Sequence, residues 1–262
     1  TELVKFWRMR LENNKTNQTH QNETKGKDIF FIIFLSIITG FLVKLKSFFP
    51  DIIDDSFYER YIGIIIMNSL IVFSFWHNKI KDIKKILSYV GFLGIILIYV
   101  SVVPLNGVKY GGDSVKLALL HLPLLLWCIW GIIFMNFDFK NYSKRIEFIR
   151  FNGELIILTG LILILGWILC LLTIALFEAI NIDILFIITD YIAIWGIVAA
   201  PIVAYYLISL KPDIIKKVVP ILAELFTPLV LAMLTVYFVA LLTSFKNIFD
   251  NRDLLLILNI VL

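Results

Sequence analysis

Four ionisable side chains lie in or beside the long apolar runs of this chain, at Glu154, Glu224, Asp190 and His121. Moving a charge into an apolar phase is costly, so such a residue is by default a candidate for binding a solute or an ion. A carboxylate can hold a cation, and a histidine titrates near neutral pH. These four residues are therefore the candidate polar or solute-binding residues.

The two glutamates also have a structural explanation. Glu154 opens an apolar run in "RFNGELIILTG", and Glu224 lies about one turn into another. An acidic residue in the first turn of a helix is stabilised by the helix dipole. Arg150 precedes Glu154 by four residues, the spacing of a helical ion pair, although Gly153 weakens a helix that starts so early. The two glutamates form one site only if their helices touch.

His121 and Asp190 both fall near the outer ends of predicted helices. As a pair they could couple a proton or a cation to transport, because histidine changes charge near neutral pH. The alternative, which we favour, is that they are two unrelated residues at the membrane interface.

Motifs for catalysis, metals or cofactors are not found in the sequence. The three histidines, His20, His77 and His121, have no metal-ligand spacing, and Cys128 and Cys170 lie in separate apolar runs. There is no Walker loop, GxGxxG motif or nucleic-acid-binding module. We therefore predict no catalytic residue, no metal, no cofactor and no nucleic-acid partner.

The composition points to a membrane protein that has the lipid bilayer as its surroundings. Of the 262 residues, 60% are hydrophobic and only 17% are charged, and the mean hydropathy is +0.91. Soluble domains are about 45–50% apolar and about 25% charged. Several runs of at least about 18 residues carry almost no charge, which is the signature of membrane-spanning helices.

The predicted fold is all-α, a polytopic transmembrane bundle. Seven full helices are expected at 29–48, 58–76, 86–105, 115–136, 154–178, 182–209 and 219–245. Residues 254–262 begin an eighth helix, but nine residues reach about 13 Å, against about 30 Å of hydrocarbon. We therefore expect the transmembrane domain, 29–262, to be truncated at its C-terminal end.

The lysines and arginines predict the orientation, because they collect in cytoplasmic loops. Seventeen of the 24 fall in the N-terminal segment and in every second loop after it, and seven fall on the alternate side. The N-terminus is therefore predicted to be cytoplasmic.

Residues 1–28 form a separate cytoplasmic segment. "TELVKFWRMRLE" places Leu3, Val4, Trp7 and Leu11 on one helical face, and a polar linker follows. Such a basic amphipathic helix either lies in the membrane interface or docks on the protein itself.

Other residues predict helix packing. Asn68, in the middle of a span, is expected to hydrogen-bond another helix, and Gly196, Ala200 and Ala204 allow a second helix to approach closely. Pro201 and Pro228 interrupt their helices and can free backbone carbonyl groups. A partner protein or a second copy could bind through the 182–209 helix or the N-terminal segment.

The second half of the chain, 144–262, resembles an uncharacterised family of bacterial polytopic inner-membrane proteins. Four stretches carry the resemblance: "RFNGELIILTG" (150–160), "AAPIVAYYL" (199–207), "FTPLVLAML" (226–234) and "NRDLLLILN" (251–259). The resemblance implies the fold type and a location in the bacterial inner membrane, and it includes Glu154, Pro201, Pro228 and Asp253. It implies no activity.

Three functions remain open. The first is a transporter or channel-like protein for a small solute or ion, with a polar site among the helices at 154–178, 182–209 and 219–245. It predicts a polar cavity that reaches Glu154, Glu224 or Asp190. The second is a non-catalytic membrane subunit that anchors, senses or assembles with a partner, which predicts a solid core. An intramembrane enzyme is disfavoured, because no nucleophile–base set is visible.

Overall fold

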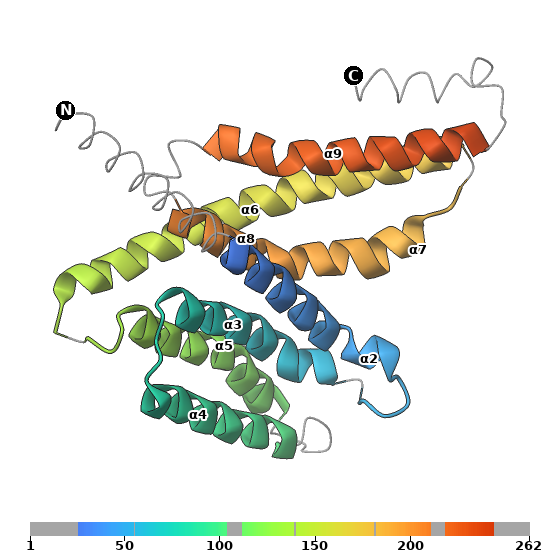
Figure 1. Cartoon of the computed structure of the whole chain (residues 1–262). Coiled ribbons are helices and arrows are strands. Elements are labelled where there is room, and N and C mark those ends of the chain that lie inside the picture. Colours follow the sequence, from blue (N-terminus) through green and yellow to red (C-terminus); the bar gives the residue numbers. More distant parts are fainter. Residues whose placement is uncertain are drawn as a thin grey trace, which may run out of the picture.

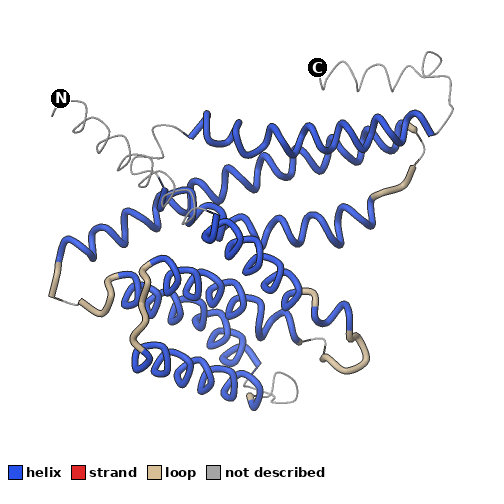
Figure 2. Tube along the Cα trace, in the orientation of Figure 1, coloured by secondary structure: helices blue, strands red, loops and turns tan. Residues whose placement is uncertain are grey.

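The chain is described here by a computed structural model. It describes residues 26–54, 56–103, 112–138, 140–180, 182–210 and 218–243. Within these ranges the chain is all-α and has no strand (Figure 2). Seven of the described helices are long and apolar enough to cross a membrane, which confirms the predicted transmembrane bundle. The predicted amphipathic helix near the N-terminus and the predicted eighth helix lie outside the described residues.

The first half of the bundle contains four spanning helices and one short one. They are Gly26–Val43, α2 (Leu45–Phe48), α3 (Phe57–His77), α4 (Ile83–Val102) and α5 (Gly112–Phe134). The second half contains α6 (Tyr142–Ala179), α7 (Leu185–Ile187), the π-helix η1 (Ile188–Ala193), α8 (Ile194–Leu210) and α9 (Val218–Thr243). Figure 1 shows α3, α4 and α5 grouped on one side and α6, α8 and α9 on the other, with the Gly26–Val43 helix between them.

One end of the bundle, which we call the basic end, is where α3 and α5 finish and α4 and α6 begin (left in Figure 1). Lys79, Lys81 and Lys84 lie there between or beside α3 and α4, and Lys140 and Lys144 lie at the start of α6. Two of the loops predicted to be cytoplasmic therefore lie at the same end of the molecule.

The helices α3 and α5 pack closely. A Cβ atom added to Gly63 would lie only 2.5 Å from Cγ of Pro123, so only glycine fits this approach. The helix α3 also contacts α4, where the hydroxyl of Tyr89 donates a hydrogen bond to Oδ1 of Asn68, at 2.6 Å. Arg60 on α3 donates to the carbonyl oxygen of Val103, at 2.8 Å, just after α4 ends. A cation is stabilising at this position, because the last carbonyl groups of a helix carry partial negative charge.

The helix α6 begins at Tyr142, twelve residues before the predicted start at 154. Oδ1 of Asn141 accepts a hydrogen bond from the backbone N–H of Ser143, at 3.1 Å, and so caps the first turn. No proline follows, and Gly153 is tolerated within the helix. With 38 residues, α6 is about 57 Å long, which exceeds the hydrocarbon thickness of about 30 Å. Its first turns therefore extend beyond the membrane at the basic end.

The predicted helix at 182–209 is not one regular helix. A π-helical segment, Ile188–Ala193, separates the short α7 from α8. Such segments interrupt the regular hydrogen-bond ladder and are frequent at functional sites. The predicted 29–48 helix is also divided, because a turn at Lys44 separates Val43 from α2.

Candidate functional site

A pocket of about 390 Å³ opens at the basic end, and we call it the Glu154 pocket. It lies between the C-terminal ends of α3, α5 and α8 and the first turns of α6. Four charged residues of α6 line it: Lys144, Glu147, Arg150 and Glu154. The pocket therefore presents two cations and two anions to whatever enters it.

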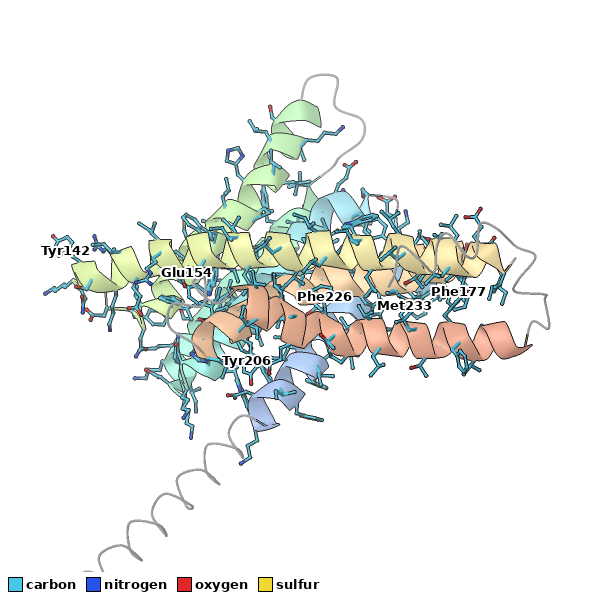
Figure 3. All side chains as sticks on the ribbon, turned by 90° about the horizontal axis from the view of Figure 1, so that it is seen from above. Tyr142, Glu154, Phe177, Tyr206, Phe226 and Met233 are labelled. Carbon is cyan, nitrogen blue, oxygen red and sulfur yellow. The ribbon has the colours of Figure 1, made fainter. Side chains whose placement is uncertain are left out.

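The early start of α6 determines how Glu154 is presented. Because the helix already includes Arg150, the two residues lie one turn apart, and Nε of Arg150 is 2.9 Å from Oε1 of Glu154. The Arg150 side chain is 65% exposed, whereas the Glu154 side chain is 12% exposed. Arg150 thus reaches the surrounding solvent while the carboxylate faces the pocket. Figure 3 shows Glu154 toward the Tyr142 end of α6.

Aromatic side chains close the pocket toward the centre of the bundle. Tyr205 of α8 is fully buried, and its ring centroid lies 4.8 Å from those of Phe73 and Phe151 and 5.9 Å from that of Trp130. Its hydroxyl donates to Oγ of Ser74, at 3.3 Å. We call Tyr205, Phe73, Phe151 and Trp130 the aromatic hub. Two residues of the aromatic hub, Phe151 and Tyr205, also line the Glu154 pocket.

Glu224 does not line the Glu154 pocket. It is an exposed residue of α9, and the pocket is formed by α3, α5, α6 and α8. The structure therefore does not bring the two predicted glutamates into one cavity. The pocket that Glu154 lines is formed with α3, α5 and α8, and α9 takes no part in it.

A second space does lie among α6, α8 and α9, but it is apolar. This crevice of about 260 Å³, which we call the apolar crevice, is lined by residues that include Gly166, Trp167, Gly196 and Phe226. Figure 3 shows Phe226 and Met233 where α6 and α9 run side by side. With no charged residue in its lining, the crevice offers nothing to hold an ion.

His121 and Asp190 are not joined by a hydrogen bond or an ion pair in the described part of the chain. His121 is an exposed residue of α5, and its Nδ1 lies 2.7 Å from the carbonyl oxygen of Leu117, to which it can donate. Asp190 lies in η1, next to Tyr191. The structure thus gives no geometry for a proton-coupling pair of these two residues.

Lys44 is a polar residue that the sequence did not single out. A lysine near the end of a span is expected to extend to the membrane surface. Lys44 is instead 3% exposed, and its Nζ lies 4.1 Å from the centroid of the Tyr191 ring, a cation–π contact. Gly40 lies one turn before Lys44, and it packs against Trp195, which lies one turn after Tyr191. No local pattern around Lys44 indicates this burial, because Tyr191 comes from a distant helix.

The small residues of α8 are divided between two environments. Ala200 and Ala204 are buried in the chain's own core, but Gly196 has no atom within 4 Å of an added Cβ. Pro201 is half-buried within α8, and Pro228 is exposed within α9. The closest helix approaches in the described residues occur at other glycines, Gly63 among them.

Among the described residues, no group of three His, Cys, Asp or Glu side chains could hold a metal ion. Comparisons of the chain with protein-family models, with curated proteins and with solved structures give no match. The fold and the exposed apolar faces of its helices define the class: the chain is a multi-pass helical membrane protein in contact with the lipid bilayer.

Proposed function

We propose that the protein is a membrane carrier for a small polar solute that bears both charge signs, such as an amino acid. The observation that carries this proposal is the Glu154 pocket, where a mostly buried carboxylate faces a space of about 390 Å³ at the end of a transmembrane bundle. Pockets for small molecules have volumes of about 300–1,000 Å³.

The charges of the pocket support a solute with both signs. Glu147 and Glu154 can accept hydrogen bonds from an ammonium group, and Lys144 and Arg150 can donate to a carboxylate. Arg150 already pairs with Glu154, and Lys144 pairs with Asp138 at 3.2 Å, so a bound solute would exchange these ion pairs for contacts with its own charges. A small zwitterion can meet both signs at once.

The aromatic hub supports a carrier rather than an open channel. Its packed rings at Tyr205 separate the Glu154 pocket from the rest of the bundle, so passage requires a second conformation. The helix that holds Tyr205 contains Pro201 and follows the π-helical segment Ile188–Ala193. Both features interrupt regular backbone hydrogen bonding, and both mark places where a helix can bend.

Ligand-induced stabilisation tests the proposal directly. The full chain, purified in detergent, is melted in the presence of each of the twenty standard amino acids, with methylamine and acetate as probes that carry one charge. We expect at least one amino acid to raise the melting temperature saturably, and the single-charge probes to have no effect. A ligand at ten times its Kd stabilises the folded state by about 1.4 kcal/mol. The same amino acid, radiolabelled, should enter proteoliposomes that contain the protein.

Two matched variants locate the effect. Glu154→Gln should abolish both stabilisation and uptake, and Glu224→Gln should retain them, because Glu224 is an exposed residue outside the pocket. The proposal fails if no amino acid stabilises the protein. It also fails if the two variants bind and transport equally well.

The second candidate function is a non-catalytic membrane subunit that assembles with a partner. It is favoured by α6 and α9, because only 11% of the apolar 18-residue segment of each helix is buried within the chain. Lipid alone also accounts for such exposure. Ala200 and Ala204 are already buried within the chain, so a partner at α8 would have to use Gly196. Co-purification with one defined protein, without any amino-acid binding, would favour this function.

The location is also part of the proposal. The resemblance over 144–262 supports the bacterial inner membrane. The distribution of lysine and arginine supports a cytoplasmic basic end, which makes the Glu154 pocket open to the cytoplasm. Labelling of single cysteines introduced at Lys84 and Ser56, with a reagent that does not cross membranes, tests this orientation.

A further inference from the structure

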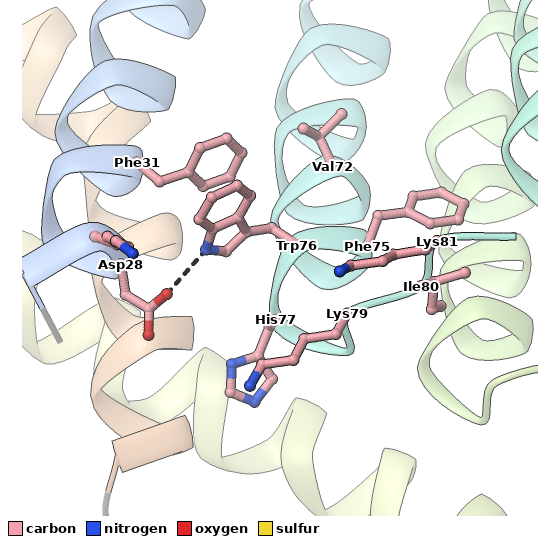
Figure 4. Close-up of a pocket in the computed structure, with 10 residues that line it drawn as sticks. Asp28, Phe31, Val72, Phe75, Trp76, His77, Lys79, Ile80 and Lys81 are labelled. Carbon is pink, nitrogen blue, oxygen red and sulfur yellow. Dashed lines mark hydrogen bonds between the residues drawn. The ribbon is translucent and has the colours of Figure 1, made fainter. Parts of the chain in front are cut away.

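A larger pocket, of about 970 Å³, shares His77 with the Glu154 pocket, and we call it the lysine pocket. It is formed by the start of the Gly26–Val43 helix, the end of α3 and the loop that leads to α4. Lys27, Lys79 and Lys81 line it, together with one carboxylate, Asp28. Figure 4 shows Lys79 and Lys81 extending from the loop toward the first helix.

The wall of the lysine pocket is held by a side-chain contact between the two helices. Nε1 of Trp76 donates a hydrogen bond to Oδ1 of Asp28, at 2.9 Å, and Phe31 stacks on Trp76 with ring centroids 4.3 Å apart (Figure 4). The Asp28 carboxylate is therefore engaged in the hydrogen bond from Trp76. In the described part of the chain it forms no ion pair with any of the three lysines, so the pocket keeps an excess of positive charge.

Lys79 has an unusual backbone conformation for its residue type. It follows α3 with φ of 50°, in the left-handed region. The backbone N–H of Lys79 donates to the carbonyl oxygen of Trp76, and the backbone N–H of Ile80 donates to that of Phe75. This is the arrangement of a Schellman motif, in which glycine is usual. Lysine at this position is strained relative to glycine, yet its side chain is directed to the pocket. The turn alone would favour glycine, so the lysine is better explained by its side chain in the pocket.

An apolar groove continues from the lysine pocket along the first helix. It shares Lys27, Phe31 and Trp76 with the pocket and adds Phe30 and Phe34, both exposed. Phe34 is two turns further into the membrane span than Lys27. Cations at the membrane surface thus join an aromatic groove that enters the bilayer, with Trp76 at the boundary, where tryptophan is enriched.

We propose that the lysine pocket binds an anionic phospholipid, with its phosphate among Lys27, Lys79 and Lys81 and one acyl chain along Phe30 and Phe34. Basic pockets between helices at the cytoplasmic surface suit anionic headgroups. The groove selects a lipid over free phosphate, because a free anion makes no contact with the phenylalanines. This site is separate from the Glu154 pocket, and only His77 lines both.

Native mass spectrometry of the delipidated full chain in detergent tests the site. Phosphatidylglycerol is compared with phosphatidylcholine of the same acyl chains, and with glycerol 1-phosphate as the free headgroup. We expect phosphatidylglycerol to bind at least about tenfold more tightly than phosphatidylcholine, and glycerol 1-phosphate not to compete at equal concentration. Equal binding of the two lipids overturns the proposal. Competition by glycerol 1-phosphate shows a free-phosphate site and also overturns it.

The decisive variant is Lys79→Gly with Lys81→Gln. Glycine suits the left-handed turn, so the variant removes two cations without weakening the end of α3, and its melting temperature should not fall. Its affinity for phosphatidylglycerol should fall about 30-fold, since about 1 kcal/mol per lysine converts at 1.4 kcal/mol per tenfold.

The matched control, Lys84→Gln with Lys140→Gln, removes two exposed cations from the same end but outside the pocket. It should keep its affinity within about threefold. If the control loses as much as the pocket variant, the binding follows overall charge and the proposed site is wrong. Phe30→Ala with Phe34→Ala should weaken phosphatidylglycerol binding as well, and unchanged binding would exclude the groove.

Discussion

The α3–α5 pair and the α6–α8–α9 group are both made of long apolar helices, but they fill the space between their helices differently. At Gly63, an added Cβ would lie 2.5 Å from Pro123, so the two helices meet backbone to side chain. At Gly166 and Gly196, an added Cβ would meet nothing within 4 Å, and the apolar crevice of about 260 Å³ remains between the helices. Long apolar helices therefore pack very differently in the two parts of one bundle.

The difference teaches what holds a membrane bundle together. Lipid chains are as apolar as the side chains that they contact, so hydrophobicity alone does not drive helices together within a bilayer. Association depends on close packing and on hydrogen bonds, and α3 has both: it packs closely against α5, and its Asn68 accepts a hydrogen bond from Tyr89 of α4. The α6–α8–α9 side leaves open space, and such space is where helices can shift against one another. Matched substitutions on the two sides measure this contrast.

The largest expected effect is at the tryptophans. Trp130 of α5 is 1% exposed and its ring lies within 6.1 Å of those of Phe148, Phe151 and Tyr205, whereas Trp167 of α6 is 55% exposed. Trp130→Ala should lower the free energy of unfolding by about 3 kcal/mol or more, because it leaves a cavity in the aromatic hub. Trp167→Ala should cost less than about 1 kcal/mol.

Titration with sodium dodecyl sulfate, starting from lipid–detergent micelles, measures both unfolding free energies. Equal losses for the two variants would show that the surroundings of Trp167, beside the apolar crevice, are as well packed as the aromatic hub. A small loss for Trp130→Ala would show that the hub can collapse around the cavity. It would then be a weaker barrier between the Glu154 pocket and the rest of the bundle.

The next effect is at the glycines. Gly63→Ala should destabilise the protein by about 1–3 kcal/mol, because Pro123 belongs to a rigid ring and the helices must separate to admit a methyl group. Gly196→Ala meets open space, and alanine is the better helix former, so this variant should be neutral or stabilising by up to about 1 kcal/mol. The same titration measures both. A destabilised Gly196→Ala would mean that the crevice closes in the membrane.

The membrane-helix fold could largely be predicted from the sequence, because each span needs a long run with almost no charge. The helix ends were less predictable. Hydropathy marks where a helix enters the membrane, but α6 begins twelve residues earlier, at Tyr142, where Asn141 caps it. This early start is what pairs Arg150 with Glu154.

The candidate site could be predicted only in part, because a pocket depends on which helices meet. Glu154 is a candidate because of its place beside an apolar run, and in the structure it lines a pocket. Its partners across the pocket come from α3, α5 and α8, and no spacing in the sequence indicates that contact. The same holds for Lys44 beside Tyr191, and for Lys79, whose left-handed conformation no residue pattern indicates.

The smallest expected effect comes from removing one tyrosine hydroxyl group, either from Tyr89 of α4 or from Tyr237 of α9. Tyr89 of α4 donates to Asn68, at 2.6 Å, whereas the buried hydroxyl of Tyr237 on α9 has no hydrogen-bond partner among the described residues. Tyr89→Phe should therefore cost up to about 1 kcal/mol, the usual size of a hydrogen bond between membrane helices. Tyr237→Phe should be neutral or stabilising, because it removes a buried polar group that gains nothing from its surroundings. Unfolding titrations measure Tyr89→Phe, Tyr237→Phe, Asn68→Ala and the double variant Tyr89→Phe with Asn68→Ala. In the Asn68→Ala background, Tyr89→Phe should cause no further loss of stability. An additive loss there would show that the two side chains stabilise the bundle independently.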